Sequence, residues 1–199
     1  MKALSPIVIS SLTVFMSIAL FAFVPASVVD YISVPGPVVF HKESYALAWS
    51  FSDKNYYKQE YIRAGDSLEK FNKMILIDVL VGGLTPKGLV AEKIQEIEKR
   101  KGQDSVANYK SFENDKTGEY VLDFLVSEGE LYEWNVYRYK LITTNNGKAV
   151  LLFGFSFRSF KGAQTSIADF FNNFEKNRND LIPAVSTYKL PAINIKTKN

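Results

Sequence analysis

Alternating hydrophobic and polar residues dominate the stretch from Glu119 to Phe160. Three such runs, EYVLDFLVSE, YEWNVYRYKLITT and AVLLFGFSFRSF, follow one another, and the turn sequence TNNG joins the last two. Runs rich in β-branched and aromatic residues, connected by short turns, are typical of antiparallel strands. We therefore predict a three-stranded meander at the centre of the fold.

The turn TNNG leaves two registers open for the second hairpin. A two-residue loop of Asn146 and Gly147 would set the phenylalanines of the last strand mainly opposite charged residues. A three-residue loop that also includes Asn145, with Gly147 in a left-handed conformation, would set them mainly opposite tyrosines. We predict the second register, in which one aromatic face forms the core and the other face is partly solvated. The predicted core face carries Tyr120, Leu122, Phe124, Val126, Tyr137, Tyr139, Leu141, Phe153, Phe155 and Phe157.

The opposite face then collects charged and aromatic residues that form our candidate binding site. Its members are Asp123, Trp134, Arg138, Lys140 and Arg158. Such a cluster can bind an anionic or aromatic ligand. The alternative is a cross-strand ladder of charges, with Glu119 opposite Lys140 and Asp123 diagonal to Arg138, an arrangement that sheets use routinely.

Further strands are predicted before the meander. Alternation over 45–52, followed by a turn and the run 56–63, indicates a hairpin, and 106–113 has the pattern of another strand. The segment 75–81 fits a helix and a strand equally well, because β-branched residues alternate in it but a helix pattern precedes it. We leave its assignment open.

Three helices are predicted from capping residues and apolar spacing. Thr85 before a proline predicts a helix that ends at Gly102, and Asp66 begins a capping-box pattern for a short helix. A closing helix is expected from about Ser166 to just before Pro183. The fold class predicted from these elements is α+β, a mainly antiparallel sheet with helices packed on one face.

The N-terminus has the organisation of a secretory signal. Lys2 precedes an apolar run that is interrupted by serines and a threonine and ends in Val24-Pro25-Ala26. We predict a signal peptide over 1–26, with an uncleaved membrane anchor as the alternative. Residues 27–44 are then an extended lead-in, 45–183 a single domain and 184–199 a partly ordered basic tail.

Composition excludes several chemistries and suggests a compartment. The chain has no cysteine and one histidine, His41, so disulfides, thiolate nucleophiles and multi-histidine metal sites cannot form. A formal net charge of +3 is too small to indicate a nucleic-acid partner or an anionic membrane. We expect no cofactor and no metal. Exported proteins without disulfides are commoner in bacteria, so we expect a periplasmic or secreted bacterial protein, with membrane contact only if the N-terminal segment is retained.

One short segment resembles known proteins. YIRAGDSLEKFNKM, with Tyr61, Gly65, Asp66, Leu68 and Phe71, is similar to a segment of uncharacterised bacterial exported proteins, which often have tryptophan at the position of Phe71. The order of the predicted elements also resembles the PsbP-like α+β sandwich. This resemblance implies a noncatalytic accessory or binding role, and it carries over no binding residues.

The sequence shows no catalytic constellation. We therefore expect a binding or accessory protein, not an enzyme, whose partner is an unknown protein or small molecule. One alternative is a hydrolase that uses Asp123, Tyr137 and Ser156, although the predicted register places Asp123 and Tyr137 on opposite faces. The other is a membrane-tethered structural protein that keeps its N-terminal segment.

Overall fold

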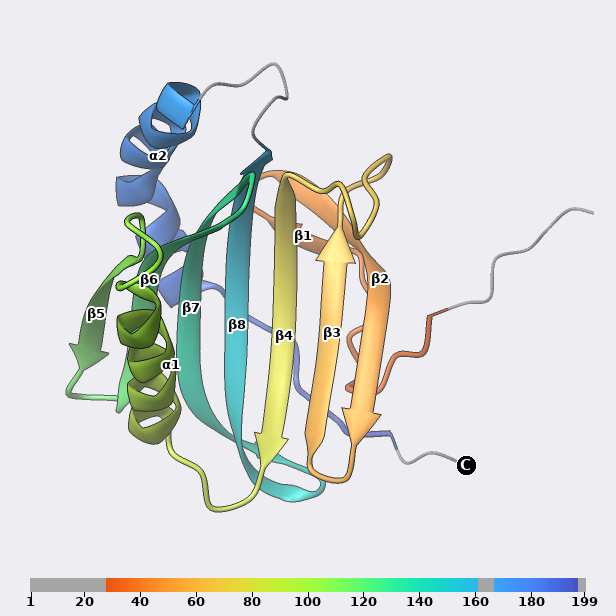
Figure 1. Cartoon of the computed structure of the whole chain (residues 1–199). Coiled ribbons are helices and arrows are strands. Elements are labelled where there is room, and N and C mark those ends of the chain that lie inside the picture. The colour runs from red at the N-terminus through yellow and green to blue at the C-terminus, as the bar shows by residue number, and fades with distance from the viewer. Residues whose placement is uncertain (1–27, 161–166, 197–199) are drawn as a thin grey trace, which may run out of the picture.

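The computed structural model describes residues 28–160 and 167–196, so the signal predicted for 1–26 lies outside the described residues. Eight antiparallel strands form one curved sheet in the order β1-β2-β3-β4-β8-β7-β6-β5 (Figure 1). The strands are β1 (Val38–Phe40), β2 (Glu43–Asp53), β3 (Tyr56–Ile62), β4 (Lys73–Val81), β5 (Asn108–Asn114), β6 (Glu119–Glu128), β7 (Leu131–Thr144) and β8 (Gly147–Phe160). The helices are α1 (Pro86–Arg100) and α2 (Ile167–Thr187).

The two helices lie on opposite faces of the sheet, so the prediction that helices pack on one face is wrong. α1 packs on β5, β6 and β7 and contributes Val90 and Ile97 to one buried cluster. α2 packs on β6, β7 and β8 and contributes Phe170 and Leu181 to a second cluster. Figure 1 shows α1 in front of the sheet and the C-terminal part of α2 behind it. Because the central strands are apolar on both faces, each face needs its own cover.

The second hairpin of the meander has neither of the two registers that we considered. Its loop consists of Asn145 and Asn146, and β8 begins at Gly147, whose φ is 109°. Phe153, Phe155 and Phe157 lie opposite Arg138, Val136 and Trp134. A shift of one residue from the predicted register turns these three rings to the α2 face, away from the tyrosines of β7. The α2 face, which we expected to be partly solvated, is therefore a core face, and Trp134 on it is only 1% exposed.

The helices and strands before the meander are partly as predicted. Thr85 caps α1 and its side chain accepts a hydrogen bond from the Gly88 backbone N at 3.1 Å, which confirms that helix. The segment 75–81, which we could not assign to a helix or a strand from the sequence, is part of β4. The short helix predicted from Asp66 does not form, because its carboxylate bonds the Arg63 side chain at 3.1 Å and the segment folds into turns.

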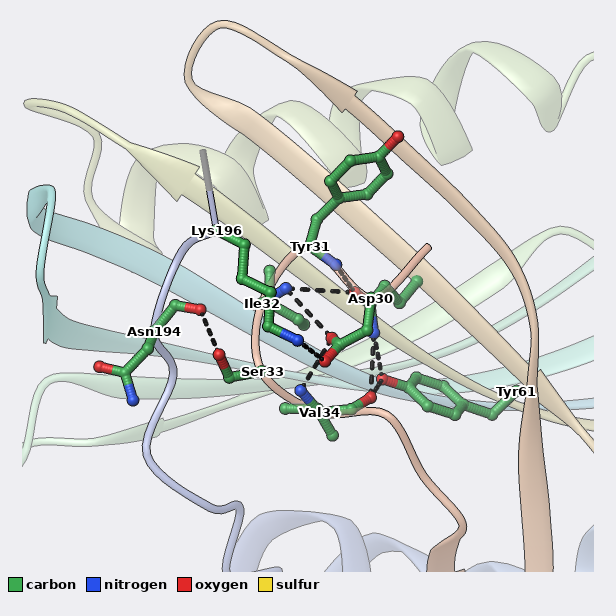
Figure 2. A network of polar contacts seen from close by, with 9 residues as sticks. Asp30, Tyr31, Ile32, Ser33, Val34, Tyr61, Asn194 and Lys196 are labelled. Carbon is green, nitrogen blue, oxygen red and sulfur yellow. Dashed lines mark hydrogen bonds and ion pairs between the residues drawn. The ribbon is translucent and has the colours of Figure 1, made fainter. Parts of the chain in front are cut away.

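A buried polar network holds the lead-in segment against β3 (Figure 2). Gln59 is completely buried, and its Oε1 accepts hydrogen bonds from the backbone N of Tyr31 at 2.7 Å and of Ile32 at 3.2 Å. Its Nε2 donates to the Val34 carbonyl at 3.1 Å, and the Tyr61 hydroxyl donates to the same carbonyl at 2.7 Å. The polar backbone groups of the lead-in are thus hydrogen-bonded by side chains of β3 inside the fold.

The segment after α2 joins the same network. Lys196 Nζ lies 2.6 Å from Asp30 Oδ2, and the Ser33 hydroxyl donates to the Asn194 carbonyl at 2.8 Å (Figure 2). Ile195 is 4% exposed. Residues 184–196, expected to belong to a partly ordered tail, are packed on the sheet, and Pro183, expected just past the helix, lies inside α2.

Candidate functional site

A pocket of about 200 Å³ lies between α2 and the sheet, and we call it the α2 pocket. Strands β2, β4, β7 and β8 and one side of α2 surround it. Its lining residues are His41, Glu43, Tyr45, Lys73, Trp134, Phe155, Phe157, Asn173, Lys176, Asn177 and Leu181. The pocket thus combines aromatic and charged side chains that are far apart in the sequence.

The floor of the α2 pocket is aromatic and rigidly packed. Tyr45, Trp134 and Phe155 are 0%, 1% and 2% exposed. The rings of Trp134 and Phe155 meet edge to face, with their centroids 6.2 Å apart. The observed register of β7 and β8 brings these two rings to the same face of the sheet. Such a floor suits an apolar or planar group of a ligand.

One side of the rim is an ion pair. Lys73 Nζ lies 2.9 Å from both carboxylate oxygens of Glu43, and the Tyr45 hydroxyl donates to Glu43 Oε2 at 2.8 Å. Burial acts to raise the pKa of Glu43, but the hydrogen bonds from Lys73 and Tyr45 outweigh it, so this pKa lies below its ordinary value. Glu43 is therefore ionised at neutral pH and has no proton to give.

The other side of the rim carries an unbalanced positive charge. Lys176 on α2 is exposed and forms no ion pair with any residue in the described part of the chain. The positive charge of Lys73 is balanced by Glu43 across the pocket. The rim of the α2 pocket therefore favours an anionic group next to the aromatic floor.

Of the predicted site residues, Trp134 lines the α2 pocket and Asp123 supports it. Trp134 Nε1 donates to Asp123 Oδ1 at 2.7 Å, and Arg178 Nη2 on α2 lies 2.5 Å from Asp123 Oδ2. Asp123 is only 3% exposed. Its carboxylate therefore ties α2 to the sheet and fixes the Trp134 ring.

Arg138 and Lys140 lie elsewhere on the α2 face. Both pair with Glu119, at 2.6 and 3.2 Å, which confirms the predicted cross-strand pair of Glu119 and Lys140. Arg138 Nη1 also donates to the Tyr188 carbonyl at 2.9 Å. The two residues line a groove of about 560 Å³ beside the segment that follows α2. Asp123 pairs with Arg178 and not with Arg138.

Arg158 is on the α1 face, apart from the other four residues. It pairs with Glu133, and its guanidinium lies 4.2 Å from the centroid of the Phe71 ring. The register of β8 accounts for this position, because residue 158 now faces the same way as residue 133. The five predicted residues thus do not form one site.

The residues of the hydrolase alternative do not come together. Ser156 is completely buried and donates to Asn135 Oδ1. Ser156 and Tyr137 face α1, whereas Asp123 bonds Arg178 on the opposite face. The sequence did not identify Glu43, Lys73 and Lys176 as pocket residues, because they belong to three separate elements and their spacing follows no motif. We treated His41, which also lines the pocket, as an ordinary surface residue.

One of three comparisons with known proteins found a match, and it covers most of the fold. A protein-family model matches residues 32–190, from before β1 to beyond α2, and the chain belongs to that family. No curated protein and no solved structure shows significant similarity to the chain.

The described part of the chain has no metal-binding cluster and no membrane-spanning helix. Residues 28–160 and 167–196 hold no group of three or more histidine, aspartate or glutamate side chains placed to bind a metal ion. In the same ranges, neither helix combines the length and apolar character needed to cross a membrane.

Proposed function

We propose that the protein is a noncatalytic binding protein that holds a small aromatic molecule with an anionic group in the α2 pocket. The observation that carries the proposal is the buried aromatic floor of Tyr45, Trp134 and Phe155 beside Lys176, which lacks an acidic partner among the described residues. The ring of the ligand packs on the floor, and its anionic group faces the lysine.

The charge state of the pocket supports binding over catalysis. Acid–base catalysis by carboxylates needs two of them with separated pKa values. Among the residues that the structure describes, Glu43 is the only carboxylate that lines the α2 pocket, and Lys73 and Tyr45 keep it ionised. We propose a location outside the cytoplasm of a bacterium, which the predicted signal peptide over 1–26 and the resemblance of 61–74 to exported proteins support.

Tryptophan fluorescence tests the proposal directly. The chain has two tryptophans, Trp134 in the pocket and Trp49 on the sheet surface. The Trp49→Phe variant leaves Trp134 as the only tryptophan, so its emission reports the α2 pocket. We expect phenylacetate to change this emission saturably, and 2-phenylethanol, which has a similar skeleton but no charge, to bind more weakly.

A pair of lysine variants supplies the control. In the Trp49→Phe background, Lys176→Gln should reduce phenylacetate affinity to that of 2-phenylethanol. Lys99→Gln, on the exposed side of α1, removes the same charge far from the pocket and should leave the affinity unchanged. Emission that does not respond to phenylacetate, or equal affinity in both lysine variants, would refute the proposal.

A further inference from the structure

A second cavity lies on the α1 face, between α1 and strands β3 and β4. Its volume is about 290 Å³, and we call it the acidic cavity. Its polar lining consists of Tyr56, Asp78, Glu92, Lys93, Glu96 and Tyr139. It is separate from the α2 pocket, because the sheet lies between them.

Asp78 on β4 is half-buried and lines this cavity. Its Oδ2 accepts a hydrogen bond from the Tyr56 hydroxyl at 2.9 Å. Its Oδ1 is enclosed and has no hydrogen-bond partner among the described residues. A buried carboxylate oxygen without a donor is unusual in a folded protein, and a ligand that brings a donor resolves it.

Two carboxylates of the cavity form no ion pair with a described residue, although Lys58 lies opposite Asp78 in the sheet and the charges of Lys58 and Lys93 act to lower the pKa of Asp78. Lys93 pairs with Glu96, and Lys58 on the neighbouring strand pairs with Glu60 at 2.8 Å. Asp78 and Glu92 form no ion pair with any residue of 28–160 or 167–196. The cavity is therefore complementary to positive charge.

The aromatic walls select the kind of cation. The rings of Tyr56 and Tyr139 line the cavity, and aromatic faces attract ammonium groups. A metal ion fits less well, because the described part of the chain holds no cluster of three acidic or histidine ligands. An ammonium group, with three donors, supplies the hydrogen bond that Asp78 Oδ1 lacks.

We propose that the acidic cavity binds a short aliphatic diamine, with one ammonium group on Asp78 and the other on Glu92. Asp78 lines the cavity from β4 and Glu92 lines it from α1, so a flexible chain with a positive charge at each end suits both carboxylates. The methylene groups pack against the tyrosine rings. This site is independent of the α2 pocket and of the ligand proposed there.

Isothermal titration calorimetry of the full-length protein with 1,4-diaminobutane tests the site. The diamine should bind at least about tenfold more tightly than butylamine, which has one ammonium group. Asp78→Asn should weaken diamine binding by a similar factor, and Glu92→Gln should reduce it to the affinity of butylamine. Asp115→Asn, in the exposed turn before β6, is the matched control and should bind as the wild type does.

The pH dependence of binding adds a second readout. Burial raises the pKa of Asp78 to about 6, so diamine affinity should fall as the pH drops from 7.5 to 5, and this fall should vanish in Asp78→Asn. The other charged or titratable groups around Asp78 are Tyr56, Lys58, Glu60, Glu92, Lys93, Glu96, Tyr137 and Tyr139.

Three outcomes would overturn the diamine site. They are no heat of binding for the wild type, equal affinity of the wild type and Asp78→Asn, and equal loss in Asp78→Asn and Asp115→Asn. Lys176→Gln should leave diamine binding unchanged, so failure at the α2 pocket and failure at the acidic cavity are distinguishable.

Discussion

Lys73 on β4 reaches past β3 to donate to both carboxylate oxygens of Glu43 on β2, at 2.9 Å each. The two side chains are about one-third exposed, at 32% and 33%, so the pair contributes little to stability, roughly 0.2–1 kcal/mol. Its main effect is on the charge of the α2 pocket, because it neutralises one of the two lysines at the rim.

Glu43→Gln should therefore strengthen the binding of phenylacetate severalfold. The change frees Lys73 and adds a second unpaired positive charge beside the aromatic floor. Fluorescence titration in the Trp49→Phe background measures the effect. Weaker binding in this variant would show that Glu43 contacts the ligand itself and would contradict the charge balance described above.

The stability of Glu43→Gln should also depend on pH in a defined direction. Because the pKa of Glu43 is lowered in the folded chain, its stabilisation is present above the unfolded pKa and is lost as the pH falls through the folded pKa. The variant should be slightly less stable than the wild type at pH 7 and equally stable at pH 2–3. Urea unfolding at both pH values measures this difference, and a variant that is more stable than the wild type at pH 7 would contradict the lowered pKa of Glu43.

Arg178→Met should destabilise the fold strongly. It leaves the Asp123 carboxylate, 3% exposed, with Trp134 Nε1 as its remaining partner. Removing one partner of a buried ion pair costs about 3–5 kcal/mol, and the lower end applies because Arg178 is 22% exposed. Lys101→Met breaks the exposed pair with Glu98 and should change the stability far less, because solvent screens this pair. Chemical denaturation that ranks the two variants equally would contradict the role of Asp123 as a tie between α2 and the sheet.

Gly154→Ala should also be destabilising, because the position has no room for a side chain. A Cβ there would lie 2.7 Å from Leu76 Cγ and 2.8 Å from Tyr137 Cδ1. Overpacking of this kind costs about 1–3 kcal/mol. Gly102→Ala is the matched control, since a Cβ at that position meets no atom within 4 Å. A wild-type melting temperature for Gly154→Ala would mean that Leu76 and Tyr137 do not crowd this position.

Asp78→Asn should stabilise the protein at neutral pH. The pKa of Asp78 is raised to about 6 by burial, so its ionised form disfavours the fold, and the stability present below its ordinary pKa of 3.8 is lost as the pH rises through about 6. The difference corresponds to roughly 1–3 kcal/mol above pH 6. Thermal unfolding should show a more stable variant at pH 7.5 and no gain at pH 4. A gain that is the same at both pH values would contradict the raised pKa.

The sequence predicted the positions of the strands along the chain better than it predicted which side chains point to which face of the sheet. Alternation located the hairpin of β2 and β3 and the three strands of the meander, and the Thr85 cap located α1. The register of β8 was wrong because we weighed Arg138 and Lys140 opposite phenylalanines as unfavourable. In the structure both basic side chains pair with Glu119 on β6. Their charges are therefore balanced even where an apolar residue of β8 lies directly opposite.

The error of one residue in register also explains the errors about the site. It placed Arg158 on the same face as Asp123 and the phenylalanines on the same face as Tyr137, and it put both helices over that one aromatic face. The α2 pocket itself depends on Glu43, Lys73 and Lys176, which come from three elements and carry no local motif. Only the order of strands β1-β2-β3-β4-β8 brings them together, and that order is not encoded in the alternation of any single strand.

The most direct test of the α2 pocket is a set of intermolecular nuclear Overhauser effects between phenylacetate and the protein. The account predicts contacts from the ligand ring to Trp134 and Phe155, with none to Trp49, whose ring is 38% exposed and stacks on Phe51 outside the pocket. Contacts to Trp49 alone, or no contacts at a saturating concentration of phenylacetate, would contradict it.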